Sequence, residues 1–349
     1  MRIAVKLAGV RVDEDGHIAG RDAGATLVRR LLRVFPGAQV IGDGPRHGDG
    51  FDVVPLGFVT GSDTIVVNMD VLDSLHVWDV LHATCEEPHI MNFVWWSTSE
   101  VTHPVQRAEL ALSCGLFPTF ANSEHTAIEV HEVVDALTVR QVAAGARIGW
   151  VNLGFRREHV QPRREPEVPV VLYPAIYLSE RKRPQLFIDI VERVARRTPI
   201  VVEARLHETH LIRELAMDLS SRRWAWVGPL TATREGYWEA LSRTTAFLAT
   251  SREESYGLEY VEALAAGAVG VFPDLPWARD LLPPTYPFRY RTAQEAEAML
   301  LRAVTDTAAC RAELDVCAGG DFAGWLQARH SDDRFDRAIV DHVRDWFGT

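Results

Sequence analysis

Glu254-Ser255-Tyr256-Gly257-Leu258-Glu259-Tyr260-Val261-Glu262-Ala263-Leu264-Ala265-Ala266-Gly267 is the stretch that decides the fold of this chain. The apolar run Thr245–Thr250 before it and the run Val269–Phe272 after it each predict a strand. Between them, apolar residues recur at helical spacing and share one face. The segment therefore predicts a strand, a charged turn containing glycine, a helix and a second strand, which is the repeating unit of a parallel α/β sheet.

The turn lies where a doubly wound sheet binds its ligands, at the carboxyl end of a strand. The first backbone N–H groups of a helix have no partner within it, and together with the helix dipole they attract phosphate. Glu262 follows on the edge of the apolar helix face, beside Leu258. From there its carboxylate can accept hydrogen bonds from paired hydroxyl groups of a ligand.

This segment resembles the signature of the retaining nucleotide-sugar glycosyltransferases of the "glycosyl transferases group 1" type, which have two Rossmann-like domains facing across a cleft (the GT-B architecture). The family pattern is Glu, an aromatic-Gly-Leu, Glu-Ala after seven intervening residues, and a small-residue run ending in Gly. The matching residues are Glu254, Tyr256-Gly257-Leu258, Glu262-Ala263 and Gly267. The resemblance implies that Glu254 contacts the donor sugar, that the amides of Ser255, Tyr256, Gly257 and Leu258 hold the diphosphate, and that Glu262 holds the ribose. An ordinary βαβ unit with two solvated glutamates is the alternative.

Composition narrows the class of protein. The chain has 349 residues, of which 47% are hydrophobic, and this length favours two domains over one. A formal charge of −11 argues against non-specific nucleic-acid binding, which requires a basic surface. No apolar run approaches the ~20 residues that span a bilayer, and the start of the chain shows no secretory signal pattern. The four cysteines have neither CxxC nor metal-ligand spacing. We expect a cytoplasmic protein with reduced thiols and no integral membrane segment.

Strand and helix patterns alternate in two series. The first series predicts helices at Asp22–Phe35, Asp73–Thr84 and Ser123–Ala144, and strands at Ile3–Leu7, Ala38–Ile41, Thr64–Asn68, Ile90–Trp95, Phe117–Ala121 and Arg147–Val151. A polar, proline-bearing linker covers Arg156–Pro169. The second series predicts strands at Val170–Tyr173, Ile200–Ala204 and Trp224–Val227, and helices at Pro184–Arg197, His210–Ser221 and Arg234–Ser242.

These series predict two Rossmann-like domains. We place the amino-terminal, acceptor-side domain at residues 1–160 and the carboxyl-terminal, nucleotide-sugar domain at 161–330. The helix predicted at Arg334–Phe347 belongs to a terminal segment, 331–349. In the resembled family the terminal helix crosses back to pack on the first domain, and we expect the same here.

Two other segments contribute donor-side candidates. Gly20 and Gly24 lie in the loop and helix start that follow the first strand, where a missing Cβ lets backbone approach a phosphate. The resemblance implies a donor-facing role for both, although ordinary turn chemistry also explains them. Lys182 lies in a cationic cluster before a helix start, which is electrostatically unfavourable unless an anion binds there. The family neutralises the diphosphate with a Lys at this point, which implies a catalytic role for Lys182. A solvated basic turn is the alternative.

The chain departs from the family pattern at two places. The family has an Arg five or six residues before its Lys, where this chain has Ile176 and Tyr177. Many members carry an acceptor-side His near the position of Trp95-Trp96-Ser97, and none occurs there. Trp96, Glu100 and His103 are the acceptor-side candidates in its place.

The sequence predicts no metal site and no cofactor. Asp13-Glu14-Asp15 resembles the Asp-x-Asp metal motif of a different glycosyltransferase class, but an acidic turn in a polar loop explains it as well. The histidines form no HExxH motif or ligand-spaced cluster, and no P-loop or Gly-x-Ser-x-Gly elbow is present.

The expected function is retaining transfer of a sugar from a nucleoside-diphosphate sugar, UDP- or GDP-linked, to an unidentified acceptor. One alternative is a non-catalytic protein that binds a nucleotide sugar or sugar phosphate on the same fold. Another is an epimerase or phosphorylase. The sequence specifies neither the acceptor nor the oligomeric state.

Overall fold

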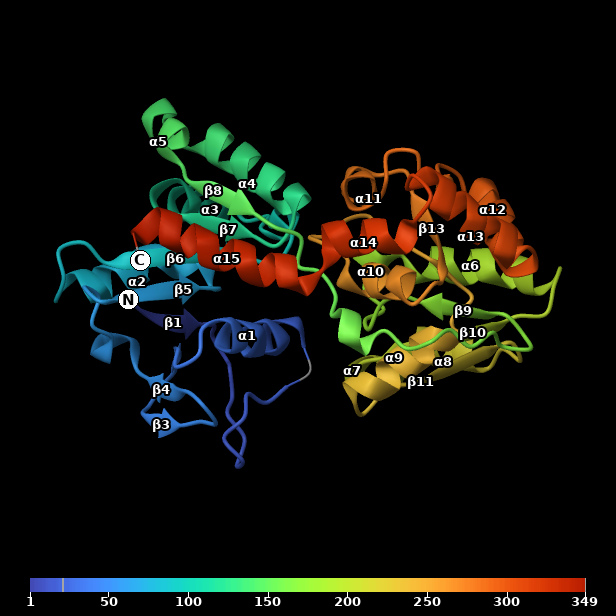
Figure 1. The fold of residues 1–349 in the computed structure, drawn as a ribbon, viewed down its shortest axis with the longest axis horizontal. Helices are drawn as coiled ribbons and strands as arrows, with labels where there is room; N and C mark the ends of the chain where they lie inside the picture. Colours follow the sequence, from blue (N-terminus) through green and yellow to red (C-terminus); the bar gives the residue numbers. More distant parts are fainter. Residues whose placement is uncertain (21, 349) are drawn as a thin grey trace. The chain divides into compact units, whose positions relative to one another are not determined.

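The chain divides into two compact units in the computed structural model, which describes residues 1–20 and 22–348 (Figure 1). The first unit comprises residues 1–151 and 335–348, and the second comprises 152–334. The chain therefore passes between the units twice, after Val151 and after Arg334. The sequence analysis places its boundaries later in the first case, at 160, and slightly earlier in the second, at 330.

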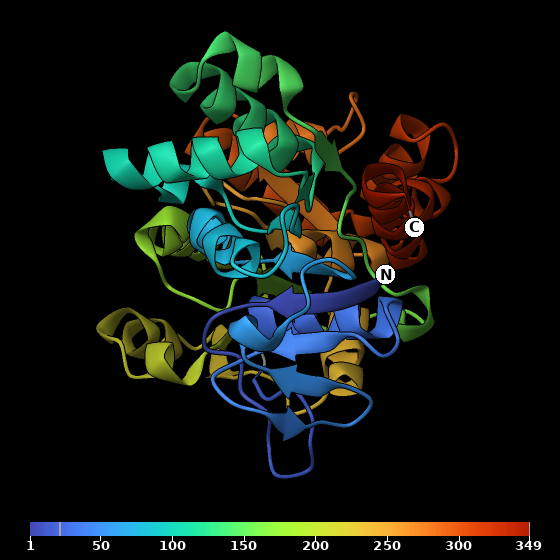
Figure 2. The same cartoon turned by 90° about the vertical axis from the view of Figure 1, so that its left-hand side faces the viewer.

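The first unit is built on an eight-stranded sheet of order β3-β4-β2-β1-β5-β6-β7-β8. All its pairings are parallel except that of β3 with β4. Several of its strands appear side by side as blue arrows in Figure 2. The strands are β1 (Arg2–Lys6), β2 (Gln39–Ile41), β3 (Arg46–His47), β4 (Asp52–Val54), β5 (Thr64–Asn68), β6 (His89–Val94), β7 (Thr119–Ala121) and β8 (Ile148–Trp150).

Helices cover both faces of this sheet. Its helices are α1 (Ala23–Val34), α2 (Ser74–His82), α3 (Pro104–Leu116), α4 (Glu124–Leu137), α5 (Arg140–Gly145) and α15 (Asp332–Phe347). The end of the chain belongs to this unit because Phe335 of α15 is fully buried against Phe93 of β6 and Phe120 of β7. Asp336 adds ion pairs to Arg30 and Arg33 of α1 at 3.1 and 2.8 Å. These contacts place α15 over the sheet (Figure 1).

The second unit has a six-stranded, all-parallel sheet of order β11-β10-β9-β12-β13-β14. Its strands are β9 (Val170–Tyr173), β10 (Val201–Leu206), β11 (Ala225–Pro229), β12 (Ala246–Leu248), β13 (Val269–Pro273) and β14 (Arg289–Tyr290). Parallel strands with helices on both faces are apolar along their whole length, as all of β13 is here.

The helices of the second unit connect and cover these strands. They are α6 (Pro184–Ala195), α7 (Glu208–Leu211), α8 (Glu214–Ser220), α9 (Arg234–Arg243), α10 (Leu258–Ala265), α11 (Pro276–Leu281), α12 (Ala293–Thr305), α13 (Thr307–Cys317) and α14 (Phe322–His330). Helix α12 packs on α6, and α10 packs on α14.

The predicted elements are confirmed except where helices were joined or overlooked. The helix predicted at Ser123–Ala144 begins at its expected N-cap, since Ser123 Oγ accepts from the N–H of Thr126 at 3.0 Å. It is broken into α4 and α5 because Thr138 is extended and its hydroxyl bonds the carbonyl of Val134 at 2.8 Å. The helix predicted at His210–Ser221 is likewise split into α7 and α8. The sequence analysis missed α3, the short strands β3, β4 and β14, and the helices α11 to α14.

Within residues 1–20 and 22–348, no helix combines the length and apolar character needed to cross a bilayer.

Candidate active site

The strand order of the second unit places the signature loop at its topological switch point. The chain leaves β9 on one side toward β10, whereas β12 and β13 extend the sheet on the other side. Loops that leave neighbouring strands in opposite directions open a crevice at their carboxyl ends. The loop after β9 carries Lys182, and the loop after β12 carries Glu254.

Two hydrogen bonds to backbone carbonyl groups join these loops. The hydroxyl of Thr250 donates to the carbonyl of Lys182 at 2.7 Å, and the N–H of Arg252 donates to the carbonyl of Arg181 at 3.0 Å. Lys182 ends a turn of 3-10 helix, and Arg183 after it is left-handed, with φ 47°. A non-glycine residue pays for this conformation with steric strain. The strained residue is the N-cap of α6, so that Pro184 begins the helix two residues after Lys182.

Lys182 and Glu254, the two predicted catalytic residues, meet in the structure. The ammonium group of Lys182 donates to Oε1 of Glu254, which also accepts from the hydroxyl of Tyr260 at 2.8 Å. Glu254 is only 7% exposed. A buried carboxylate requires such partners, because desolvation of an unpaired charge is costly. The pair holds a cation and a carboxylate at the switch point.

The first turn of α10 offers unpaired backbone donors beside this pair. Gly257 precedes the helix with φ 81°, and a Cβ there would lie 2.5 Å from Cδ2 of Tyr260. No side chain in the described part of the protein caps the helix. Among residues 1–20 and 22–348 no acceptor faces the N–H groups of Leu258 and Glu259. These amides and the positive end of the helix dipole lie where the sequence predicts an anion-binding feature.

The side chain of Tyr256 points away from this turn, into the protein. Its hydroxyl accepts from the N–H of Gly154 at 3.0 Å and lies 2.9 Å from Nδ1 of His330. Nε2 of His330 lies 3.1 Å from the carbonyl of Leu281. Burial lowers the pKa of His330 to about 3, so the ring is neutral. Tyr256 thus connects the signature loop to both segments through which the chain enters and leaves this unit, whereas Ser255 is half-buried in the loop itself.

Glu262, the predicted ribose carboxylate, is 2% exposed and forms an ion pair with Arg234 at the start of α9. The guanidinium of Arg234 also lies 4.9 Å from the ring centre of Tyr237. The sequence analysis missed Arg234. Arg234 is the first residue of α9, after the N-cap Thr233, and this position in the sequence does not predict an ion pair with a distant residue.

Tyr177 occupies the place where the resembled family has a phosphate-binding Arg. Its ring centre lies 5.5 Å from that of His207 and 5.1 Å from that of His210. His210 is buried, and its Nδ1 accepts from the N–H of Leu178 at 3.0 Å. An aromatic cluster therefore takes the place of a cation.

Gly20 and Gly24 belong to the first unit, between β1 and the first turn of α1. Gly20 has φ 98°, which glycine adopts without strain. A Cβ on Gly24 would lie 2.9 Å from Cδ2 of Leu7 and 3.4 Å from Cη2 of Trp95. Close packing against Leu7 and Trp95 therefore accounts for the glycine at 24 without a ligand.

The three acceptor-side candidates lie on one segment after β6 but differ in environment. Trp96 packs against an apolar cluster under α3 and α4, where it is half-buried. Glu100 and His103 are exposed, and His103 is the N-cap residue of α3 without a side-chain capping bond. The segment thus combines one anchored ring with two accessible polar side chains.

A charged group that sequence reasoning missed lies at the switch point of the first sheet, between β1 and β5. Nζ of Lys6 lies 2.8 Å from Asp70 and 2.7 Å from Asp73. Asp70 also accepts from the N–H of Ala8 at 2.7 Å. Burial opposes protonation of Lys6, but its two carboxylate partners raise its pKa overall. The sequence did contain a signal for this group. Lys6 ends β1, and Asp70 and Asp73 follow β5, and a doubly wound sheet brings the ends of such strands together.

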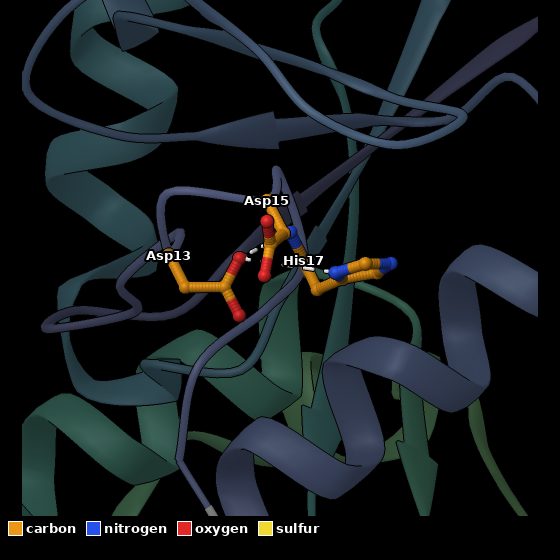
Figure 3. A group of neighbouring side chains, drawn as sticks. All are labelled: Asp13, Asp15 and His17. Carbon is orange, nitrogen blue, oxygen red and sulfur yellow. Dashed lines mark hydrogen bonds and ion pairs between the residues drawn. The ribbon is translucent and has the colours of Figure 1, made fainter.

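Asp13, Asp15 and His17 form a group whose ligand atoms all lie within 4.8 Å of one another (Figure 3). All three are exposed. A hairpin turn brings them together, with the N–H of His17 donating to Oδ1 of Asp13 at 2.8 Å. Nε2 of His17 lies 3.3 Å from Asp49. Turn geometry and ion pairing account for the group, so we assign no metal to it.

Comparisons with known proteins identify the fold. No protein-family profile matches the sequence, and no curated protein matches it significantly. Solved structures match over nearly the whole length. A lipopolysaccharide outer core galactosyltransferase is 14% identical, with a TM-score of 0.66 over 99% of this chain and 100% of that one. Sucrose-phosphate synthase from Thermosynechococcus elongatus is 13% identical, with a TM-score of 0.66 over 99% of both. A trehalose-6-phosphate structure from E. coli, bound with UDP-2-fluoro glucose, is 13% identical, with a TM-score of 0.63 over 98% and 99%.

The chain has the GT-B fold. In this GT-B chain the loops at the switch point of the second sheet carry Lys182 and Glu254, and Glu262 lies within α10, which follows the second of these loops. The GT-B fold was predicted from the signature and from the two series of alternating strands and helices, and the near-complete coverage of both chains confirms it.

Proposed function

We propose that this chain is a retaining glycosyltransferase that transfers a sugar from a nucleoside-diphosphate sugar to an acceptor. The observation that carries the proposal is the convergence of Lys182, Glu254 and the unpaired amides of α10 at one switch point. The GT-B fold, shared with a galactosyltransferase and with sugar-phosphate synthases, supports the same class of reaction.

Charge in the transition state explains why these groups suit the reaction. Breaking the bond between sugar and phosphate builds negative charge on the departing diphosphate and positive charge on the sugar ring. Donors that already point at the diphosphate stabilise that charge without reorganising, usually the largest catalytic contribution. Lys182 and the amides of Leu258 and Glu259 would supply them. These groups provide the positive potential, so the proposal requires no metal ion.

In this proposal the two signature carboxylates accept hydrogen bonds from hydroxyl groups of the donor. Glu254 would orient the sugar, because Lys182 and Tyr260 fix its carboxylate in place. Glu262 would hold the ribose once Arg234 releases it or shares it. The amides of Ser255, Tyr256 and Gly257 are further diphosphate donors. The first unit would serve the acceptor, with Trp96, Glu100, His103 and the Lys6–Asp70 pair as candidates.

A panel of sugar nucleotides tests the proposal. UDP-linked donors come first because one structure of this fold is bound with UDP-2-fluoro glucose, and GDP-linked donors follow. Melting temperature reports donor binding, and release of free nucleoside diphosphate reports transfer or slow hydrolysis. The proposal fails if no donor stabilises the protein.

Variants test whether any turnover that the panel detects depends on the candidate site. Glu254→Gln and Glu262→Gln should each lose most turnover while the protein stays folded at the assay temperature. Glu253→Gln alters the exposed neighbour of Glu254 and serves as the matched control. Full turnover in both signature variants would contradict the assignment.

One observation favours a second candidate, a protein that binds a sugar nucleotide without transferring the sugar. Tyr177 and two histidines stand where the resembled family has a cation. Loss of one phosphate-stabilising charge would weaken catalysis more than binding. Stabilisation by a donor without any release of nucleoside diphosphate would identify this candidate.

A further inference from the structure

Glu259 is the carboxylate of the donor site that this chain leaves unpaired. It is the second residue of α10 and is half-buried. Within residues 1–20 and 22–348 its side chain makes neither a hydrogen bond nor an ion pair. The two signature carboxylates differ from it, because Glu254 has Lys182 and Glu262 has Arg234.

Charged side chains of three segments act on Glu259. Lys182 of the β9–α6 loop and Arg234 of α9 attract its negative charge, and Glu254 of the signature loop repels it. Three phenols also lie within its field, on β9, α9 and α10 itself: Tyr173, Tyr237 and Tyr260. Both cations of this set already face a buried carboxylate, so Glu259 is not neutralised.

A bound diphosphate would occupy the same electrostatic field as Glu259. The first turn of a helix attracts an anion, whether it is a side chain of the helix or a ligand. A sugar nucleotide brings two negative charges to that turn. Two anions confined to one poorly solvated site do not both stay charged at low cost, and the weaker acid takes up a proton.

We propose that Glu259 takes up a proton when a nucleoside-diphosphate sugar binds, so that donor affinity weakens as the pH rises. The inference rests on the proposed function. The protonated carboxyl group becomes a hydrogen-bond donor facing the phosphate or the sugar, in place of a repelling charge. Glu259 is therefore a specificity-determining residue that couples donor binding to pH.

The free protein is already poised for this step. Burial raises the pKa of Glu259; Lys182 opposes the shift, and repulsion by Glu254 adds to it. The donor raises the pKa further. Between the two pKa values, the complex holds more protons than the free protein, so lower pH favours binding. The window opens above the ordinary carboxyl value of 4.5.

Isothermal titration with UDP-glucose and with GDP-mannose tests the inference on the full chain. Both phosphates of these donors are diesters with constant charge, unlike the terminal phosphate of UDP, which titrates near pH 6. Titration in two buffers of different ionisation enthalpy counts the protons taken up. We expect up to about one proton per donor, and a Kd that rises up to about tenfold per pH unit within the window.

Two variants test whether Glu259 is the group that takes up the proton. Glu259→Gln should remove the uptake and the pH dependence and bind the donor about tenfold more tightly near pH 8. Glu235→Gln removes an exposed carboxylate from the first turn of α9 and should behave like the parent protein. Equal pH dependence in the Glu259→Gln variant would overturn the inference.

The remaining outcomes show whether the inference alone fails or the proposed function fails with it. Donor binding without proton uptake overturns the inference alone. So does an affinity gained only with Mg²⁺ and without proton uptake, because a metal ion would then neutralise the site. If neither donor binds the parent protein or the variants, the proposed function and the inference both fail.

Discussion

The hydroxyl of Tyr256 lies 2.9 Å from Nδ1 of His330, a fully buried imidazole 74 positions further along the chain. The same hydroxyl accepts from the N–H of Gly154 at 3.0 Å. Residues 155 and 331 pair as an isolated parallel bridge beside this contact. The aromatic residue of the signature thus connects the signature loop to the two segments that lead to the first unit.

Tyr256→Phe should destabilise the protein by about 1–3 kcal/mol, because two buried polar groups lose their partner. The measurement is urea unfolding of the full chain. A matched control is Tyr177→Phe, which changes a half-buried ring outside this network. Unchanged stability of the Tyr256→Phe variant would show that water replaces the hydroxyl.

The neutral state of His330 predicts a pH dependence of stability. Burial lowers its pKa to about 3, below the unfolded value of about 6.5. Between these values the unfolded chain binds more protons than the folded protein, so stability is lost as the pH falls below about 6.5. From pH 7 to pH 5 we expect a loss of about 2 kcal/mol that His330→Gln does not share. Equal slopes for the two proteins would rule the histidine out.

Variants of the ion pair between Lys182 and Glu254 distinguish its contribution to stability from its contribution to activity. Lys182→Met leaves a buried carboxylate without its cation and should cost about 2–5 kcal/mol. The double variant Lys182→Met with Glu254→Gln should recover most of that loss in urea unfolding while remaining inactive. A double variant as unstable as the single one would show that the cation contributes through packing.

Gly257→Ala should lose both stability and donor binding. The residue has φ 81°, and the added methyl would lie 2.5 Å from Tyr260. The expected cost is about 1–3 kcal/mol from backbone strain, and more if the ring moves. Gly44→Ala is the control, because a Cβ there meets nothing within 4 Å. Thermal unfolding with and without UDP-glucose measures both effects.

Phe335→Ala should destabilise the first unit by about 3–5 kcal/mol. Its ring is fully buried between Phe93 and Phe120, and the guanidinium of Arg30 lies 4.0 Å from its centre. Phe58→Ala, at a residue that is 82% exposed, should change stability by less than about 0.5 kcal/mol. Similar midpoints for the two variants would contradict the packing of α15.

Much of the fold follows from local sequence patterns. Strands such as β5 are continuous apolar runs, and helices such as α1 carry a clear apolar face with Asp22 as the N-cap. Local patterns fail where length or amphipathicity is small. The two-residue strand β3 has no alternation to detect, and α14 has no distinct apolar face.

The residues of the candidate site likewise fall into those that local sequence patterns predict and those that they miss. The sequence by itself determined Glu254, Gly257 and Glu262, because their spacing across a turn and one helix is local. It also marked Lys182 through an unfavourable cluster of cations at a helix start.

Only the tertiary structure decided which charges are already satisfied. It pairs Lys182 with Glu254 and Arg234 with Glu262, and it gives the Glu259 carboxylate no partner among the residues described. These partners lie on different loops of the sheet, and strand order rather than residue spacing brings them together. Electrostatic interaction depends on distance and burial, which one-dimensional spacing does not specify.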